Sequence, residues 1–339
     1  MNVTMKDIAE ELGISIGTVS KVLRDHPDIS DKMRERVQRR IRELNYRPNL
    51  AARTLVTGRT YTVGLVAPDL VHPFFGELAA GLSKPLRKKG YSLIISPTDE
   101  DFDLESRAID QLLARRVDAL LVAPSQRGSE WLKALENQST PLILIDRRPD
   151  GVKVHFVGAK DEEIGYLATS HLIQVGCRRI AHIGGPLIST AIGRLNGFRR
   201  ALQHAGYSYN PEFVISREHA DEASDATGYA AMNNLLSGRR LPDGVFCYND
   251  PTAMGAMQAA IEKGLRIPQD LAIIGAGNVR YSKFLRVPLS TIDQRSGEIG
   301  ERAARLALKL IETRARARPR TILITPELIV RESSARKTL

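Results

Sequence analysis

Residues 3–23 read VTMKDIAEELGISIGTVSKVL, a stretch that predicts two short helices separated by a tight turn. Thr4, followed three residues later by Asp7, is typical of a capping box, in which each side chain accepts from the other residue's backbone amide. Gly13 is the residue type that most readily ends a helix in the left-handed conformation. The first helix is therefore expected to lie between Thr4 and Gly13.

The second helix is expected to begin at Ser15, whose hydroxyl can accept from a backbone amide of the first turn. Val19 and Val22 lie at the spacing of a buried helix face, so the polar residues between them are left outside. A third helix is expected from near Ser30, because apolar residues continue at helical spacing as far as Leu44. These three elements predict a small helical domain at the N-terminus.

This N-terminal region carries an excess of positive charge. The whole chain has a formal net charge of +10, and residues 33–59 hold eight Arg side chains against two Glu. Such a cluster suits the phosphates of nucleic acid, and a solvated helix face is the alternative interpretation. The basic residues are Arg34, Arg36, Arg39, Arg40, Arg42, Arg47, Arg53 and Arg59.

From Tyr61 onward the pattern changes to short apolar strands that alternate with helical segments. Runs rich in Val, Ile and Leu predict parallel strands covered by helices on both faces. The strand candidates are too many for one ordinary sheet, so we expect two similar α/β subdomains. They read TVGLVAPD, YSLIISP, VDALLVAPS, PLILID, RRIAHIGG, EFVISRE, GVFCYND and DLAIIGAG.

The expected domain boundaries follow from these patterns. The helical domain spans 1–47, a short helix and linker span 48–60, and the α/β core spans 61–339. The chain is expected to cross between subdomains near residues 158–161 and to return through PLSTIDQ and TILITPELIV. The first subdomain would hold about 61–160 and 291–320, and the second about 161–290 and 321–333. A ligand of such a pair is expected in the cleft at the carboxyl ends of the strands.

Several other classes of protein are not supported by the composition. Cys177 and Cys247 lie far apart without metal-ligand spacing, so neither a zinc site nor a disulfide framework is expected. The acidic residues of the opening MNVTMKDIAEEL do not fit a signal peptide, and no apolar run is long enough to span a bilayer. A cytoplasmic protein without cofactor or metal is expected. The G-x-S-x-G match GISIG at 13–17 lies between two expected helices and not after a strand, as a nucleophile elbow requires, so an enzyme is not expected.

Four motifs together make the chain resemble the LacI/GalR family of transcriptional regulators nearly end to end. In chain order they are VTMKDIAEELGISIGTVSKVL, ELNYRPNLAARTL, HPFFGELAAGL and YNDPTAMGAMQAAIEKGLRIPQDLAIIG. The resemblance implies an all-α helix-turn-helix domain followed by an α/β core of two parallel-sheet subdomains, similar to type I periplasmic binding proteins. It also implies a repressor that binds a pseudo-palindromic DNA operator as a homodimer under the control of a small molecule.

The resemblance assigns DNA contacts to the second helix, whose first residues would enter the major groove. Ile16, Gly17 and Lys21 would face bases, and Lys21 would supply most of the discrimination, because Gly17 has no side chain. In resembling proteins a hinge helix pairs in the minor groove, where Leu55 would wedge into a base step beside Ala52. The other implied DNA contacts are Ser15, Thr18 and Ser20, which would donate to phosphates, together with Arg24 and Asn49.

The resemblance also implies an effector site at the strand ends. The sequence GAGNV at 275–279 lacks the aspartate that sugar-responsive relatives usually carry in this turn, where Gly277 stands. A carbohydrate is nevertheless the leading candidate, with Asn278 taking part of the aspartate's role. The candidate effector residues are polar or aromatic residues at strand ends, where a ligand in the cleft would meet them: Asp69, His72, Phe74, Asp146, Arg147, Arg194, Asn249, Asp250 and Asn278. Of these, Arg194, Asp146 and Asn249 best match the ligand positions of the family.

Two alternative functions are considered, a solute-binding protein that uses the same α/β core and an enzyme. A solute-binding protein would need no DNA and no basic N-terminal module, so retention of residues 1–60 on duplex DNA would argue against it. A nicotinamide-dependent enzyme is suggested by GAGNVR at 275–280, but Arg280 stands where the third glycine of the dinucleotide fingerprint belongs. The final SARKTL shows no heptad pattern, so a dimer rather than a tetramer is expected.

Overall fold

The structure is a computed structural model in which the chain forms two compact units, residues 1–60 and 61–339. Each unit is described by itself. The described residues are 3–23, 25–46, 54, 57–125, 131–132, 135, 139–149, 151–216, 224–313 and 318–336.

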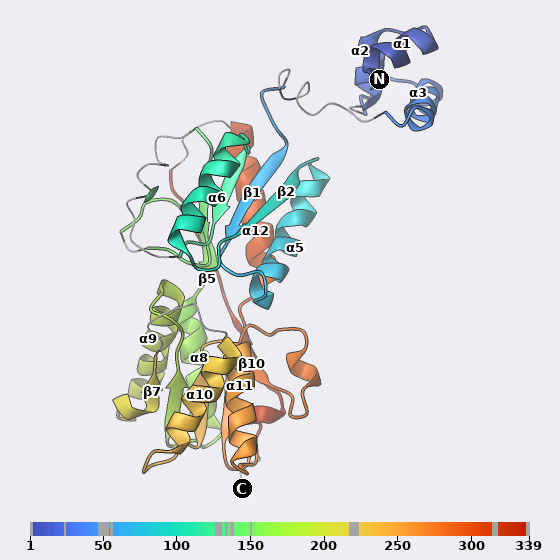
Figure 1. The fold of residues 1–339 in the computed structure, drawn as a ribbon. Coiled ribbons are helices and arrows are strands. Elements are labelled where there is room, and N and C mark those ends of the chain that lie inside the picture. Colours follow the sequence, from blue (N-terminus) through green and yellow to red (C-terminus); the bar gives the residue numbers. More distant parts are fainter. Residues whose placement is uncertain are drawn as a thin grey trace. The chain divides into compact units, whose positions relative to one another are not determined.

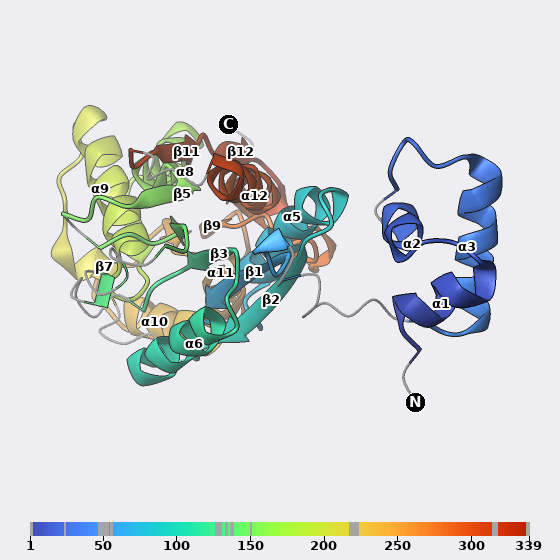
Figure 2. The same cartoon turned by 90° about the horizontal axis from the view of Figure 1, so that it is seen from above.

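The first unit contains the helices α1 (Met5–Leu12), α2 (Ile16–Leu23) and α3 (Asp31–Glu43), which surround a small apolar core (Figure 2). The capping box is confirmed, since Thr4 N donates to Asp7 Oδ2 at 2.7 Å and Asp7 N donates to Thr4 Oγ1 at 3.3 Å. Gly13 ends α1 with a φ of 63°. The first two helices therefore lie where the sequence predicts them, and the third begins beside Ser30 as expected.

The second unit begins with a six-stranded sheet in the order β11-β5-β4-β3-β1-β2, in which all neighbouring strands are parallel. The helices α5 (Pro73–Lys88) and α12 (Ser296–Thr313) cover one face, and α6 (Phe102–Ala114) covers the other (Figure 1). The strands are β1 (Thr62–Ala67), β2 (Ser92–Pro97), β3 (Ala119–Val122), β4 (Leu142–Ile145), β5 (His155–Ala159) and β11 (Thr321–Ile324).

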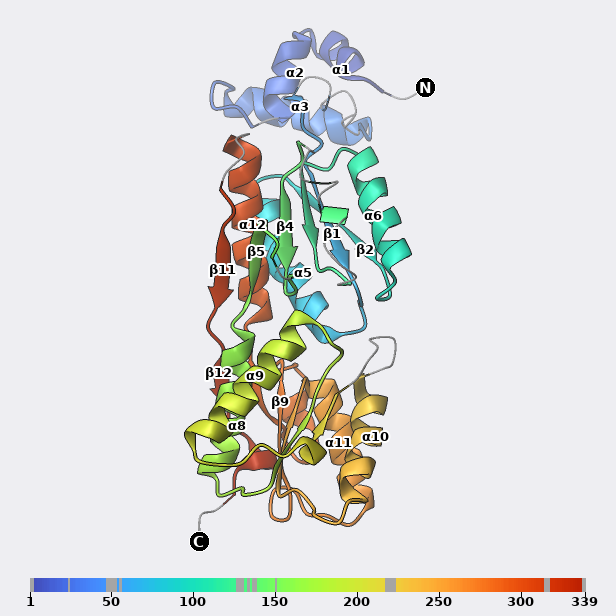
Figure 3. The same ribbon diagram turned by 90° about the vertical axis from the view of Figure 1, so that its left-hand side faces the viewer.

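A second six-stranded sheet follows in the order β12-β10-β9-β8-β6-β7, and only β12 runs antiparallel to its neighbour. The helices α8 (Asp161–Gln174) and α9 (Ser189–His204) lie on one face, with α10 (Ser224–Leu236) and α11 (Asp250–Glu262) on the other (Figure 3). The strands are β6 (Ile180–Ile183), β7 (Val214–Ile215), β8 (Gly244–Cys247), β9 (Ala272–Ala276), β10 (Ser290–Asp293) and β12 (Glu327–Ile329). Short 3-10 turns lie at Pro211–Phe213, Ser282–Phe284 and Glu332–Ser334.

The chain crosses between the two sheets three times, and two of the expected boundaries need correction. Residues 291–293 belong to β10 in the second sheet, although we expected them in the first subdomain. Thr321–Ile324 forms β11 in the first sheet, parallel to β5, although we expected it in the second. The segment TILITPELIV contains two apolar runs, TILI and ELIV, and either run could pair with either sheet. Pro326 lies between them and cannot donate a hydrogen bond to a neighbouring strand, so the two runs form separate strands.

Helix pairs in both subdomains pack closely at glycines. A Cβ added at Gly165 of α8 would lie 1.9 Å from Arg194 O of α9, and one at Gly197 of α9 would lie 2.0 Å from Glu162 O of α8. The same reciprocal pattern occurs at Gly81 and Gly300, where α5 meets α12. Backbone contact at these points is possible only because glycine has no side chain. The close contact of α8 with α9 therefore fixes the backbone position of Arg194, from which its side chain extends.

Among the described residues, no helix combines the length and apolar character that crossing a bilayer requires.

We predict that Gly165→Ala lowers the free energy of unfolding of the second unit by at least about 2 kcal/mol, because its methyl group would force α8 and α9 apart. Gly76→Ala in α5 is the matched control, since a Cβ there meets nothing within 4 Å and alanine favours helix. Urea denaturation followed by circular dichroism measures both. Equal effects of the two substitutions would contradict the close-contact account.

Candidate functional site

The exposed face of α2 is the first candidate site. Val19 and Val22 are buried against α1 and α3, whereas Ile16 is 46% exposed and Gly17 and Lys21 are also exposed. Thr18 and Ser20 are half-buried at the edge of this face. The helix therefore offers its first turns to solvent with few large side chains, as the sequence predicts.

Ser15 begins this helix. Its Oγ accepts from Thr18 N at 3.0 Å and lies 2.9 Å from Thr18 Oγ1, so the two hydroxyls share a hydrogen bond. The N-terminal amides of a helix and hydroxyls beside them favour an anion such as phosphate. The cap and the proposed phosphate contact thus use the same edge of α2.

Lys21 extends from the last turn of α2 toward an acidic neighbour. Its Nζ lies 3.8 Å from Asp28 Oδ2, and His26 Nδ1 lies 3.3 Å from the same oxygen. The Lys21 and Asp28 side chains are 49% and 63% exposed, so this ion pair is weak and can be exchanged for another acceptor. Sequence reasoning did not foresee this pair.

The arginines of α3 serve partly to hold the domain together. Arg36 donates to Leu12 O at 3.1 Å, which satisfies a carbonyl at the end of α1. Arg34 pairs with Asp25, and Arg40 pairs with Glu11 and Glu43. The basic run is therefore less available to phosphate than the sequence alone suggests. Arg24, Asn49, Ala52 and Leu55, and most of the 48–60 segment, lie outside the described residues.

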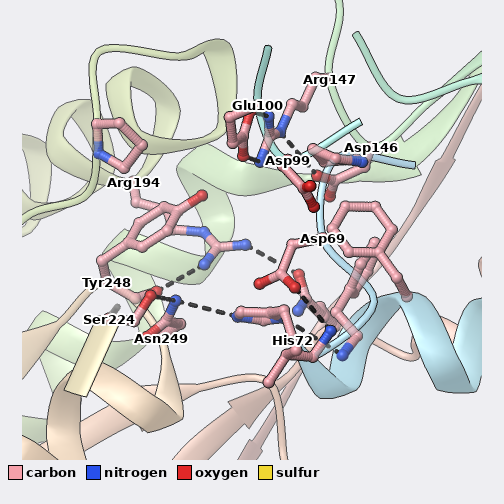
Figure 4. Close-up of a pocket in the computed structure, with 16 residues that line it drawn as sticks. Asp69, His72, Asp99, Glu100, Asp146, Arg147, Arg194, Ser224, Tyr248 and Asn249 are labelled. Atoms are coloured by element: carbon pink, nitrogen blue, oxygen red, sulfur yellow. Dashed lines mark hydrogen bonds and ion pairs between the residues drawn. The ribbon is translucent and has the colours of Figure 1, made fainter. Parts of the chain in front are cut away.

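The second candidate site is a cavity of about 360 Å³ where the two sheets of the second unit meet (Figure 4). Ten of the sixteen described lining residues lie within three residues after the end of a strand of one sheet or the other, as expected for parallel sheets. The lining comprises Pro68, Asp69, Val71, His72, Phe74, Phe75, Asp99, Glu100, Asp146, Arg147, Pro186, Arg194, Ser224, Tyr248, Asn249 and Gln294.

Arg194 is the most extensively bonded side chain of this cavity. Its Nε donates to Asp161 Oδ1 at 3.0 Å, its Nη1 to Tyr248 O at 2.6 Å and its Nη2 to Gln294 Oε1 at 2.9 Å. The guanidinium carbon also lies 4.7 Å from the centre of the Tyr248 ring. Because Arg194 is only 3% exposed, these contacts hold a buried charge in a single orientation.

A second buried ion pair lies in the first subdomain. Arg147 donates from both Nη atoms to Glu100, at 2.6 and 2.7 Å. Its Nε lies 3.7 Å from Asp146 Oδ2, beyond hydrogen-bond range, and has no hydrogen-bond partner within the described part of the chain. Burial raises the pKa of Asp146, against the opposing effect of Arg147 and Arg194.

Three acidic lining residues have left-handed backbone. The φ angles of Asp99, Glu100 and Asp146 are 48°, 59° and 64°. Such backbone conformations are uncommon for residues other than glycine, and they occur more often at ligand sites than elsewhere. All three residues follow strands of the first sheet and line the cavity.

His72 and Asn249 connect the two subdomains across the cavity. Asn249 Nδ2 lies 3.1 Å from His72 Nε2, while its Oδ1 accepts from Thr252 N at 2.8 Å and so caps α11 (Figure 4). Arg148 N also donates to Ser189 Oγ, at 3.1 Å, from the first subdomain to the second. These contacts are few and polar, so a ligand can compete with them.

Seven of the nine expected effector residues line the cavity, and two do not. Asp250 is fully buried, and it accepts from Val279 N at 2.8 Å and from Thr291 Oγ1 at 2.6 Å. Asn278 bonds to Asp293 and Arg331 instead. Asp250 follows the capping residue Asn249 by one helical position, which turns it about 100° away toward the sheet. The sequence did not predict the other nine lining residues, which are Pro68, Val71, Phe75, Asp99, Glu100, Pro186, Ser224, Tyr248 and Gln294. Tyr248 and Gln294 lie at the ends of the apolar runs GVFCYND and PLSTIDQ, which was the available signal.

The family comparisons agree with this architecture. Residues 4–49 match the family described as bacterial regulatory proteins, lacI family, and residues 169–334 match a periplasmic binding protein-like domain. The chain is 36% identical over 332 residues to the HTH-type transcriptional repressor PurR of Pasteurella multocida (strain Pm70), covering 97% of this chain and 98% of the relative. PurR of Haemophilus influenzae (strain PittEE) is 36% identical over 334 residues, with the same coverage.

Solved structures of transcriptional regulators are also similar to this chain over nearly its whole length. The Lac repressor dimer bound to operator and the anti-inducer ONPF has a TM-score of 0.84 and 26% identity, covering 98% of this chain and 99% of that one. The complex of the transcriptional regulator CelR with cellobiose has a TM-score of 0.74 and 29% identity, covering 98% and 100%. The expected fold, a helix-turn-helix region before two parallel-sheet α/β subdomains, is confirmed.

A buried carboxyl group behind the cavity leads to a prediction about pH. Glu105 on α6 is 1% exposed, accepts from Ser125 N at 2.7 Å, and has its pKa raised to about 7, chiefly by burial. Because the folded-state pKa of Glu105 lies above its ordinary value of 4.5, the contribution of Glu105 to the free energy of unfolding is most favourable below about pH 4.5 and is lost as pH rises through about 7. Glu105→Gln should therefore be more stable than the parent protein at pH 8, by up to about 3 kcal/mol.

Urea denaturation across this pH range measures the effect, and the exposed Glu327→Gln on β12 is the control. A parent stability that stays flat between pH 4.5 and 8, or an equal change in both variants, would contradict the assignment to Glu105.

Proposed function

This chain belongs to the lacI family of bacterial regulatory proteins, and we propose that it is a repressor whose hold on operator DNA is set by a small molecule bound in the Asp146–Arg194 cavity. The observation that carries the proposal is the presence, in one chain, of an open α2 face and of a polar cavity lined from two subdomains. The relatives are transcriptional repressors, which favours regulation over enzymatic activity.

The DNA-binding part of the proposal rests on α2. A recognition helix that enters the major groove presents its first residues to base edges. Ile16 suits a thymine methyl group, Lys21 can donate to guanine O6 and N7, and Gly17 contributes no side chain. Ser15, Thr18 and Ser20 would position the helix on phosphates. Arg24, Asn49, Ala52 and Leu55 remain proposed contacts on the strength of the family resemblance.

The ion pair between Lys21 and Asp28 adds a step to this proposal. The exposed Lys21 ammonium group lies 3.8 Å from the Asp28 carboxylate, so replacing Asp28 by a better hydrogen-bond acceptor costs little free energy. Guanine would replace Asp28 as the acceptor, and the released carboxylate would lie close to the DNA. Because Asp28 competes with the bases for Lys21, only a base with good acceptors, such as guanine O6 and N7, compensates for breaking this ion pair, which sharpens the preference for the correct base.

The effector part rests on the chemistry of the cavity. Carboxylates such as Asp69 and Asp146 accept hydrogen bonds from hydroxyl groups, and the aromatic rings of Phe74 and Phe75 provide apolar contact. This combination suits a polyhydroxylated ligand, and a carbohydrate is the proposed class. One similar structure contains cellobiose, which is consistent with this class.

Regulation requires that the ligand distinguish two arrangements of the subdomains. A ligand that contacts residues of both sheets would stabilise one arrangement over the other, in competition with the contact between His72 and Asn249. The change would reach the DNA through the 48–60 segment and alter the spacing of the two helix-turn-helix domains in the homodimer. Whether the ligand releases or strengthens binding depends on which arrangement it favours.

We predict that Lys21→Ala relaxes base preference at one position of each half-site by about 1–3 kcal/mol, because a bidentate contact to guanine is lost. Selection of operator DNA from a random pool by the full-length variant and parent measures this preference. Lys6→Ala on α1 removes an equal charge and should leave the selected sequence unchanged. If Lys21→Ala weakens binding equally for all sequences, Lys21 contacts phosphate and its assigned role is wrong.

We predict that a carbohydrate found by screening against the selected operator changes operator affinity at least about fivefold and raises the melting temperature of the protein. Asn249→Ser keeps an oxygen to cap α11 but removes the amide from the cavity, so it should weaken the ligand response while retaining operator binding. Fluorescence anisotropy of labelled operator measures both effects. An undiminished ligand response in Asn249→Ser would place the ligand elsewhere.

A further inference from the structure

The lining of the cavity has an excess of negative charge. Among the described residues that form it, four carboxylates stand against two guanidinium groups, and none is a lysine. The acidic residues are Asp69, Asp99, Glu100 and Asp146, and the basic residues are Arg147 and Arg194. The formal excess is therefore two negative charges before any ligand enters.

Both positive charges are already matched by partners within the protein. Arg147 is held by both oxygens of Glu100, so each of its Nη atoms has a carboxylate partner. Arg194 donates to Asp161, which is 15% exposed, and to two neutral oxygens. Asp161 is an additional carboxylate outside the lining. Toward the remaining acids, the contact of these arginines is Arg147 Nε at 3.7 Å from Asp146 Oδ2, which is too long for a hydrogen bond.

Asp146 is the clearest example of a lining carboxylate without a hydrogen-bond partner. It is 9% exposed and lines the cavity, yet its carboxylate makes no hydrogen bond to any described residue. The nearest cationic atom, Arg147 Nε, stays at 3.7 Å. A buried carboxylate without a hydrogen-bond donor is energetically costly, and it persists where a ligand supplies the missing donor.

The other unmatched acids lie around the same space. Asp69 Oδ1 accepts only from Val71 N, at 2.6 Å, within its own loop. Asp99 is exposed, and its side chain makes no hydrogen bond or ion pair to the described residues. Figure 4 shows the side chains of Asp69, Asp99 and Asp146 among the labelled groups that surround the cavity. Together they form an acidic wall, which we define as these three residues.

We infer that the effector carries a protonated amine as well as hydroxyl groups, as an amino sugar does, and that the acidic wall of Asp69, Asp99 and Asp146 binds the ammonium group. This inference rests on the proposed function, because it concerns the ligand of the same cavity. A neutral sugar supplies hydroxyl donors but leaves the excess charge in place when the cleft closes. A phosphate or carboxylate would add to that excess, with both arginines already occupied.

The direct test compares matched ligands on the full-length protein bound to its selected operator. D-glucosamine, D-galactosamine and D-mannosamine are each compared with the neutral parent sugar and the N-acetyl derivative, at a pH that keeps the amines protonated. Glucose 6-phosphate is the anionic probe. Melting temperature and operator affinity are recorded for each compound.

At least one amine is expected to bind at least about tenfold more tightly than its parent sugar and its N-acetyl derivative, because a charge-assisted hydrogen bond is lost in both. Equal or tighter binding of a neutral sugar, or of glucose 6-phosphate, would overturn the inference and leave the proposed carbohydrate effector standing. If no compound of any class changes either readout, the inference fails together with the carbohydrate proposal.

A substitution provides a second readout that needs no ligand. Asp146→Asn is expected to raise the melting temperature of the ligand-free protein, because it removes a buried charge whose pKa burial raises. The same variant should lose at least about tenfold more affinity for the amine than for the neutral parent sugar, because only the amine loses a charge-assisted hydrogen bond. The exposed Asp110→Asn on α6 is the matched control. A lower melting temperature for Asp146→Asn would show that its carboxylate is satisfied without ligand, which contradicts the inference.

Discussion

The cavity depends on one interaction, the buried guanidinium of Arg194. Its three bonds connect α9 to Asp161 at the start of α8, to the end of β8 at Tyr248 and to Gln294 after β10. A charge so deeply buried must be paired, or it costs several kcal/mol. The close contact of α8 and α9 at Gly165 sets the position of Arg194, so backbone packing determines the orientation of the ligand site. These contacts give the second subdomain a rigid wall that a ligand can bind without reorganisation.

The first subdomain supplies a different kind of wall. Its groups, Asp99, Glu100 and Asp146, sit on uncommon backbone conformations, and its arginine is held by Glu100. Among the described residues, polar contacts that cross from one wall to the other join His72 with Asn249 and Arg148 with Ser189. A ligand that bonds to both walls adds to these weak links and biases the arrangement of the subdomains. That bias is the physical requirement for any effect on DNA binding.

Much of this organisation could be predicted from the sequence, and the rest could not for identifiable reasons. The caps at Thr4 and Ser15 are local, so the helices of the first unit were predictable. Strand ends in parallel sheets converge, which located Asp146 and Asn249. Thr321–Ile324 belongs to the first sheet because it pairs with β5, a strand far away in the sequence, and composition does not encode such pairing. Asp250 differs from Asn249 by one helical position, and only the helix geometry shows that it turns away. The partners of Arg36 and Arg40 likewise required the folded domain.

The central claim is that the cavity and the operator-binding surface are coupled in one protein, and reciprocity tests it most directly. The affinity of the full-length protein for a cavity ligand should be measured by calorimetry with and without saturating operator DNA. Thermodynamic linkage requires operator to change ligand affinity by the same factor by which ligand changes operator affinity. The account predicts equal factors of at least about fivefold in the two measurements. A ligand affinity that is unchanged by operator would contradict it.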